Sequence, residues 1–177
     1  MPFDLIHSER VYQGRAFAIR RDQVRLPNGH STQLDIVEHV GSAIIIPLDE
    51  RGNVTLIRQY RHAAGDDLLE LPAGTLEPGE DPLIGARREV REETGLDADL
   101  IREIGGFYLA PGYSTEFMHV YLATGLHPAP LERDEDEFLE VVQMPVAEVM
   151  RKARAGEIPD AKTLAALLLS QAYFADS

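Results

Sequence analysis

The chain has 177 residues, of which 44% are hydrophobic and 27% are charged. This composition is typical of a globular domain with a sizeable core and excludes a disordered chain. No apolar run approaches the ~18 to 20 residues that span a bilayer, so no membrane partner is expected, and the first ten residues lack the apolar segment of a signal peptide. The absence of cysteine excludes disulfides, thiolate zinc sites and cysteine nucleophiles, and it fits a cytoplasmic location.

The net charge of −13 bears on the class of ligand. It argues against nucleic-acid binding, which requires a basic patch. It also repels a phosphate-bearing substrate unless divalent cations intervene.

The first forty residues predict a small antiparallel sheet. The stretch RVYQGRAFAIRRDQVRL has the period of a β-strand, and Asn28-Gly29 stands where a hairpin turn prefers this pair. The following STQLDIVEHV predicts the return strand. Because a three-stranded sheet of this size buries little core, we expect it to need a partner surface.

The middle of the chain predicts a second hairpin and then a helix. The hairpin strands are residues 43–48 and 54–60, joined by a turn at 50–53. A short strand in LLELPAG is broken at Pro72. Residues 81–94 form the first convincing helix, because Asp81 and Pro82 stand at its start and Gly95 just past its end.

The last third of the chain predicts three strands and two helices. Two strands flank residues 110–114, an acidic loop follows, and FLEVVQMP is the last strand. The helices are residues 146–155 and 160–174. Because strands and helices do not alternate regularly, the fold class is α+β, with a small sheet subdomain at residues 1–40 and the main domain at residues 41–177.

The helix at residues 81–94 places side chains of like charge on the same face. Glu89, Glu92 and Glu93 stand at i, i+3 and i+4, so a helix places the three carboxylates on one face. Arg87 and Arg91 form a like-charged pair on another face. A helix that is only soluble and stable normally pairs such charges, although a solvated charged face is the alternative interpretation.

Carboxylate oxygens on one helical face suit Mg²⁺ or Mn²⁺, which bind through a few carboxylates and the phosphates of a substrate. The preceding loop PAGTLEPGE contributes Gly74, Gly79 and the backbone carbonyl of Ala73. The sequence therefore predicts a divalent-metal site between this loop and the helix.

At this point the sequence resembles the Nudix box, the signature of the Nudix hydrolase family. The match runs from Gly74 to Leu96 and includes Glu80 and REVREETGL. The resemblance implies a Nudix fold, which is an α/β/α sandwich of mixed sheet. It also implies metal-dependent hydrolysis of a nucleoside diphosphate linked to another moiety.

The resemblance extends to the ADP-sugar pyrophosphatases within this family. It is carried by LIRQYRHAAGDDLLELPAGTLEPGEDP, by LPNG, by DEDEFLEV and by Pro111, fifteen residues after Leu96. It implies hydrolysis of ADP-ribose to AMP and ribose 5-phosphate with Mg²⁺ as cofactor. It also implies a homodimer formed through the amino-terminal strands.

The resemblance assigns roles to individual residues. Glu89 and Glu93 are the expected main metal ligands, assisted by the Ala73 carbonyl and Glu92, and Arg88 is expected to pair with a box glutamate. The expected catalytic residues are Glu137, which takes a proton from the attacking water, Glu92 and Glu93, with Glu135 as the alternative to Glu137. The substrate-binding residues that the resemblance implies are Arg61, Gly112 and Glu116. Apart from the resemblance, VYQGRAF offers Tyr12 and Phe17 as candidates to stack on an adenine, with ordinary strand packing as the alternative.

Two departures from the subfamily pattern concern the substrate. Leu34 stands where many members have an arginine, and APGYSTE replaces SPGFTDE. Another sugar nucleotide such as GDP-mannose is therefore an alternative substrate. A non-catalytic domain that senses a nucleotide is a further alternative, which the complete box disfavours.

Overall fold

The computed structural model describes residues 2–132 and 138–174. The chain divides into two units, each with its own set of contacts. The smaller unit comprises Met1–Gly41 and Tyr108–Phe117, and the larger comprises Ser42–Phe107 and Met118–Ser177. No helix in the described ranges is long and apolar enough to cross a membrane.

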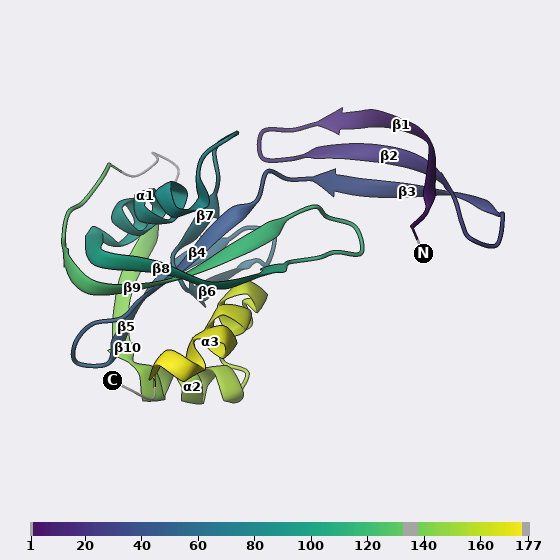
Figure 1. Ribbon diagram of the computed structural model, residues 1–177. Helices are drawn as coiled ribbons and strands as arrows, with labels where there is room; N and C mark the ends of the chain where they lie inside the picture. Colours follow the sequence, from purple (N-terminus) through teal and green to yellow (C-terminus); the bar gives the residue numbers. More distant parts are fainter. Residues whose placement is uncertain (1, 133–137, 175–177) are drawn as a thin grey trace. The chain divides into compact units, whose positions relative to one another are not determined.

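The smaller unit is built on a three-stranded antiparallel sheet, in the order β1-β2-β3 (Figure 1). The strands are β1 (Asp4–Gln13), β2 (Ala18–Arg25) and β3 (Ser31–Glu38). The turn between β2 and β3 contains Asn28-Gly29, where Gly29 has a φ of 85° and the Asn28 side chain accepts a hydrogen bond from the His30 N–H. Only glycine adopts this backbone conformation at little cost, which explains the turn.

The segment Tyr108–Phe117 joins this unit through the end of β3. The Val37 N–H donates to the Tyr113 carbonyl at 2.7 Å, and the Thr115 N–H donates to the Val37 carbonyl at 3.0 Å. The loop around Pro111 is therefore fixed by backbone hydrogen bonds to a strand more than seventy residues earlier in the sequence.

The larger unit contains two sheets. The first has the order β7-β4-β9-β8, with β4 parallel to β9 and antiparallel to β7. The second is antiparallel, with the order β10-β5-β6. The bounds are β4 Ser42–Pro47, β5 Asn53–Arg61, β6 Asp66–Glu70, β7 Ala73–Thr75, β8 Leu96–Tyr108, β9 Phe117–Pro128 and β10 Leu139–Pro145.

The predicted second hairpin is wrong in its pairing, although both strands and the turn exist. Strand β4 is flanked by β7 and β9, so neither of its edges is available to β5, which pairs with β6 and β10 instead. The two strands meet only at the turn, through an isolated bridge between Leu48 and Val54 and hydrogen bonds between Asp49 and Asn53 in the described ranges. The chain thus passes from one sheet to the other, and the order of elements alone does not reveal this.

Helices cover both faces of β4, which explains why every residue of this strand is buried. Ala43 and Ile45 pack in one cluster with Val90 of α1 (Pro82–Thr94). Ile44 and Ile46 pack in another cluster, with apolar residues of α2 (Val146–Arg154) and α3 (Ala161–Phe174). Figure 1 shows α1 on one side of the sheets and α2 with α3 on the other. This is the expected α/β/α sandwich of mixed sheet.

Candidate metal and diphosphate site

Helix α1 begins and ends where the sequence predicts, and this fixes the three box glutamates. The Asp81 side chain accepts a hydrogen bond from the Leu83 N–H, which caps the first turn. Gly95 follows the last turn with a φ of 75°, and its N–H donates to the Arg91 carbonyl. The helix therefore presents Glu89 and Glu93 from consecutive turns of one face.

The Glu89 carboxylate lies directly against the backbone of Gly74 in β7. A Cβ atom at position 74 would stand 2.0 Å from the Glu89 Cδ, which is shorter than any permitted contact. Glycine at this position is therefore required by the close approach of the carboxylate. Only 6% of Glu89 is exposed, so its charge is held in a cradle formed by the strand.

The Glu93 carboxylate is tied to the same strand. Its Oε2 accepts a hydrogen bond from the Ala73 N–H at 2.8 Å, and only 2% of the residue is exposed. Ala73 pairs with Ile44 of β4, which holds the backbone at this position in place. The structure thus brings Ala73, Glu89 and Glu93 together at the junction of β7 and α1.

Arg88 connects the box carboxylates to the preceding loop. It donates to Glu80 through Nε and Nη2, to Glu89 through Nη1 at 2.7 Å and to Glu92 through Nη1 at 2.9 Å. Its hydrogen bond to Glu80, and then the charge of Glu89, raise the pKa of Arg88 above its usual value. The same hydrogen bond lowers the pKa of Glu80. Arg88 therefore compensates part of the negative charge that gathers at the box.

Arg61 at the end of β5 belongs to a partly buried ionic cluster around the buried Glu70. Its Nε and Nη2 donate to the two oxygens of Glu70 at 2.8 and 2.7 Å. Lys162 of α3 donates to the same Glu70 carboxylate and to Asp160. The hydrogen bond to Glu70 is the main cause of the raised pKa of Arg61, and the charge of Glu93 also contributes. Arg61 thus lies within electrostatic reach of the box.

Comparison with protein-family models matches residues 38–167, most of the chain, to the NUDIX domain. This chain belongs to the Nudix family. A relative named ADP-ribose pyrophosphatase from Mycobacterium tuberculosis is 41% identical over 169 residues, which cover 94% of this chain and 82% of the relative. A relative of the same name from Bacillus subtilis is 35% identical over 164 residues, which cover 92% of this chain and 89% of the relative.

A solved structure described as an ADP compounds hydrolase has the same Nudix fold. It superimposes with a TM-score of 0.89 at 25% identity, over 99% of this chain and 96% of that one. The predicted family and fold class are therefore confirmed.

The Nudix box of this chain fits a divalent cation by the chemistry of its donors. Glu89 and Glu93 are buried, like-charged and separated by one turn, and they offer the hard oxygens that Mg²⁺ prefers. In the described ranges, no group of three or more histidine, aspartate or glutamate side chains is placed so that it could hold a metal ion. Mg²⁺ at the box would therefore need waters and substrate phosphates as further ligands.

Three expected substrate-binding residues belong to the smaller unit. Phe17 precedes β2 and is 6.2 Å from the ring of Tyr12. At Gly112, a Cβ would meet no atom within 4 Å, so this part of the loop is open. Glu116 lies 3.9 Å from Nδ1 of His39. Their contacts with a substrate stay predictions.

Two expected catalytic residues, Glu137 and Glu135, lie outside the described residues. Two residues that sequence reasoning missed are Glu70 and Lys162. A buried carboxylate at the end of a strand had a weak signal in the sequence, because Glu70 directly precedes LPAG, but nothing near it pointed to a lysine ninety-two residues later.

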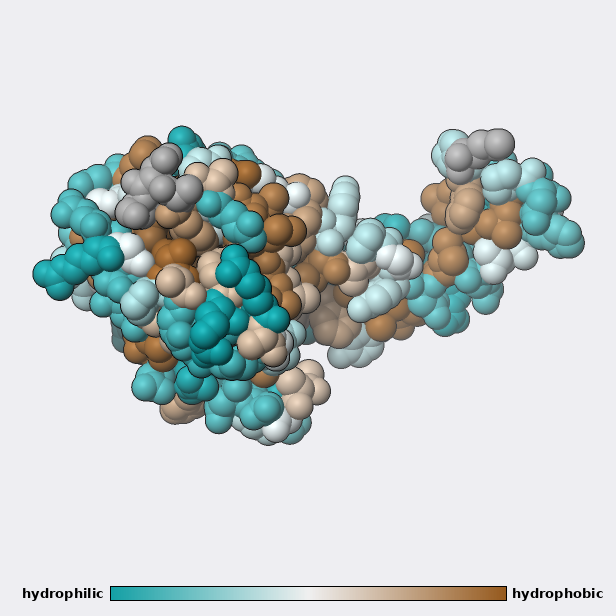
Figure 2. Space-filling model, turned by 90° about the horizontal axis from the view of Figure 1, so that it is seen from below, coloured by the Kyte–Doolittle hydropathy of each residue, from teal (hydrophilic) through white to brown (hydrophobic). Residues whose placement is uncertain are grey.

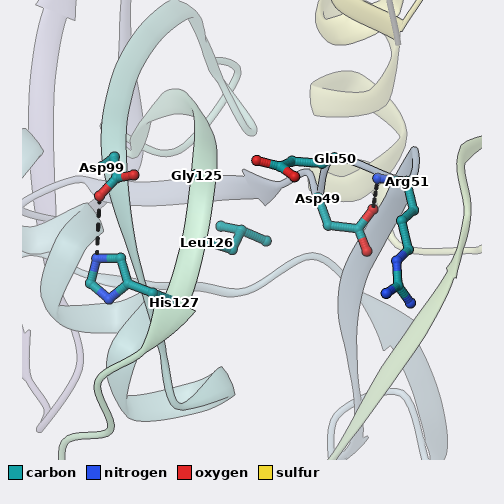
Figure 3. Close-up of a pocket in the computed structure, with 7 residues that line it drawn as sticks. All are labelled: Asp49, Glu50, Arg51, Asp99, Gly125, Leu126 and His127. Carbon is teal, nitrogen blue, oxygen red and sulfur yellow. Dashed lines mark hydrogen bonds and ion pairs between the residues drawn. The ribbon is translucent and has the colours of Figure 1, made fainter.

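A separate pocket lies away from the Nudix box, between the turn after β4 and the strands β8 and β9 (Figure 3). It is lined by Asp49, Glu50, Arg51, Asp99, Gly125, Leu126 and His127. The Asp49 carboxylate accepts hydrogen bonds from the Arg51 and Asn53 N–H groups, as expected for a turn. His127 lies 3.7 Å from Asp99. These contacts stabilise the turn and the strand ends.

Proposed function

We propose that this Nudix protein hydrolyses the diphosphate bond of ADP-ribose and releases AMP and ribose 5-phosphate. The observation that carries the proposal is the intact box geometry, in which Glu89 and Glu93 are buried against Gly74 and Ala73. The choice of ADP-ribose is supported by the relatives named ADP-ribose pyrophosphatase, which match more than nine tenths of this chain.

The residues of the chain divide the work of the reaction. Water attacks one phosphorus atom of the diphosphate, the bridging P–O bond breaks, and the proton of the water passes to a carboxylate. In our proposal Glu137 accepts that proton, with Glu135 as the alternative. Arg61 contacts the diphosphate oxygens, where a fixed guanidinium stabilises the charge that develops.

Glu89 and Glu93 would hold Mg²⁺, or Mn²⁺ in its place, with help from the Ala73 carbonyl and Glu92. When bound, the cation neutralises the diphosphate oxygens and favours deprotonation of the attacking water. A positive local site then attracts the substrate despite the net charge of −13.

The test is to incubate the protein with ADP-ribose and Mg²⁺ and to measure AMP. We expect turnover that EDTA abolishes, and a loss of about 100-fold or more in kcat for Glu93→Gln, as is typical when a group that stabilises transition-state charge is removed. Glutamine still accepts the Ala73 N–H, so the fold is expected to persist. The matched control is Glu77→Gln, an exposed glutamate of the same loop, which is expected to keep full activity.

Other results have different meanings. Faster hydrolysis of GDP-mannose than of ADP-ribose would contradict the proposed substrate but not the proposed reaction. Mg²⁺-dependent binding of ADP-ribose without any AMP would indicate a nucleotide sensor instead of an enzyme. Full activity in Glu93→Gln would contradict the proposed metal site.

We also propose that two copies of the chain associate through the amino-terminal strands. All ten residues of β1 are exposed, including Leu5, Ile6 and Val11. Figure 2 shows hydrophobic side chains on the surface of the smaller unit. An exposed strand edge with apolar side chains is a surface that proteins normally cover.

A further inference from the structure

The cluster around Glu70 has a composition that the proposed reaction does not yet explain. Lys162 is one of only two lysines in a chain that otherwise uses arginine for its cations, the other being Lys152. Its ammonium group donates to Glu70 and, at 3.0 Å, to Asp160. Glu70 is only 1% exposed, so these are interactions of a buried carboxylate and not of a surface ion pair.

The first turn of α3 is docked on the strand segment that leads to the Nudix box. The Leu71 N–H donates to Thr163 Oγ1 at 2.9 Å, across ninety-two residues of sequence. The Asp160 carboxylate caps the helix by accepting the Thr163 N–H. Two residues after Leu71, the Ala73 N–H donates to Glu93. The neighbour of Lys162 is therefore hydrogen-bonded to the segment that leads to the box, and Lys162 itself is bound to the same segment through Glu70.

The Glu70 carboxylate connects Lys162 to Arg61. Its Oε2 accepts from both Lys162 Nζ and Arg61 Nη2, while its Oε1 accepts from Arg61 Nε. The two bonds fix the plane of the guanidinium, and neither of them uses Nη1. Burial alone would raise the pKa of Glu70, but the hydrogen bonds and charges of Arg61 and Lys162 lower it, so the carboxylate stays ionised.

Removal of Lys162 would change the forces on Arg61 in two ways. Oε2 of Glu70 would lose one of its two donors, so the carboxylate could rotate. Asp160 would lose its cation, and its charge already acts on Arg61, because it contributes to the raised pKa of that residue. An uncompensated Asp160 would then compete with Glu70 for the guanidinium.

We propose that Lys162 is a positioning residue for the reaction: through Glu70 it fixes Arg61 in the orientation that contacts the diphosphate. This inference rests on the proposed function, because it concerns the same site. It assigns a role in substrate binding to the first turn of α3, which contributes no residue to the Nudix box.

The test is a double-mutant cycle on kcat/KM for ADP-ribose with Mg²⁺. We expect Lys162→Met to lower kcat/KM roughly tenfold, and to have less than a roughly twofold effect when Arg61 is already Met, because residues that act through one another are not additive. Lys162→Arg should recover most of the loss. Lys152→Met is the matched control, because in the described ranges Lys152 forms its ion pairs with Glu148 of α2 and with Glu157 just after that helix, and it should retain wild-type kinetics.

A role in stability alone would give a different pattern. Lys162→Met would then lower the urea midpoint without lowering kcat/KM at temperatures where it is folded, or its effect would be equal in the presence and absence of Arg61. Either result would overturn the inference and leave the proposed function intact. If the wild-type protein releases no AMP from ADP-ribose, the proposed function fails and this inference fails with it.

A second measurement observes the wild-type Lys162 side chain itself, so it does not require a Lys162 variant that folds. With two lysines in the chain, a protein labelled with ¹³C and ¹⁵N in lysine gives one Cε–Nζ correlation for each lysine, and Lys152→Met assigns them. We expect the Lys162 signal to shift when a methylene analogue of ADP-ribose binds with Mg²⁺, and the Lys152 signal to stay constant. Saturating analogue that leaves both signals unchanged would contradict the coupling.

Discussion

At the scale of single residues, the candidate site is defined by close approaches between glycine, carboxylate and arginine. The sequence predicts the box glutamates, because their spacing on a helix is regular and local. It does not predict Lys162 or the burial of Glu70, because these residues meet across ninety-two positions and neither has a periodic partner. Helical periodicity reveals neighbours on one element, whereas contacts between elements depend on packing.

A substitution at Gly74 tests whether the Glu89 carboxylate lies against the backbone of β7. A methyl group at this position would overlap the Glu89 carboxylate, so we expect Gly74→Ala to destabilise the fold by about 2 kcal/mol, as overpacking usually does, and to abolish most activity. The clash partner can be removed: in a Glu89→Ala background, Gly74→Ala should cost less than about 0.5 kcal/mol. Urea denaturation of the four proteins measures both values. Equal costs in both backgrounds would mean that the two residues do not touch.

Two neighbouring arginines of α1 provide a matched pair. Arg88 binds three carboxylates that are largely buried, whereas Arg87 binds Asp97 from an exposed position. We expect Arg88→Ala to cost about 2 to 3 kcal/mol, because each of these carboxylates loses a charged donor. Arg87→Ala should cost less than about 1 kcal/mol, as for exposed ion pairs. The comparison uses urea midpoints, and the reverse order would show that the box carboxylates do not depend on Arg88.

At the scale of elements, the sequence predicts which helices and strands exist, and where they begin and end, better than it predicts which strands pair. The observed α1 begins at Pro82 and ends at Thr94, as Asp81 and Gly95 indicate. The pairing of β4 with β5 was predicted wrongly, because a turn between two apolar strands is also compatible with a crossing between sheets. What decides is that β7 and β9 occupy both edges of β4, and they come later in the chain.

Strand β1 carries the prediction at this scale. Because its apolar side chains are exposed, we expect the wild-type protein to have twice the chain mass in light scattering at micromolar concentration. Leu5→Asp should produce a monomer. The control is Leu100→Asp, since Leu100 of β8 in the larger unit is exposed to a similar degree, 56% against 61%, and it should leave the mass unchanged. A monomeric wild-type protein would contradict the proposed association.

At the scale of the whole molecule, the acidity of the chain and the pairing of its carboxylates have opposite consequences. The net charge of −13 creates repulsion at pH 7 that decreases as the pH approaches the isoelectric point of about 4.8. The hydrogen bonds of Glu70 and Glu80 to arginine and lysine act in the other direction, because they hold the pKa of these carboxyls below the usual value.

The sign of the second effect follows from linkage. A carboxyl with a lowered pKa in the folded state stabilises the fold above its unfolded pKa of about 4.3, and this stabilisation is lost as the pH falls through the lower folded value. We therefore expect the urea midpoint to be highest between about pH 5 and 7 and to fall steeply below about pH 4.5.

Salt separates the two effects in one experiment. At pH 7, NaCl screens the repulsion among exposed charges and should raise the urea midpoint. Near pH 5, where the net charge is small, the same addition should change the midpoint little. Below pH 4 salt should not restore stability, because the lost contribution comes from buried and partly buried hydrogen-bonded carboxylates such as Glu70. If the urea midpoint instead decreased as the pH was lowered from 7 to 5, the group whose protonation destabilises the fold would not be one of these carboxyls.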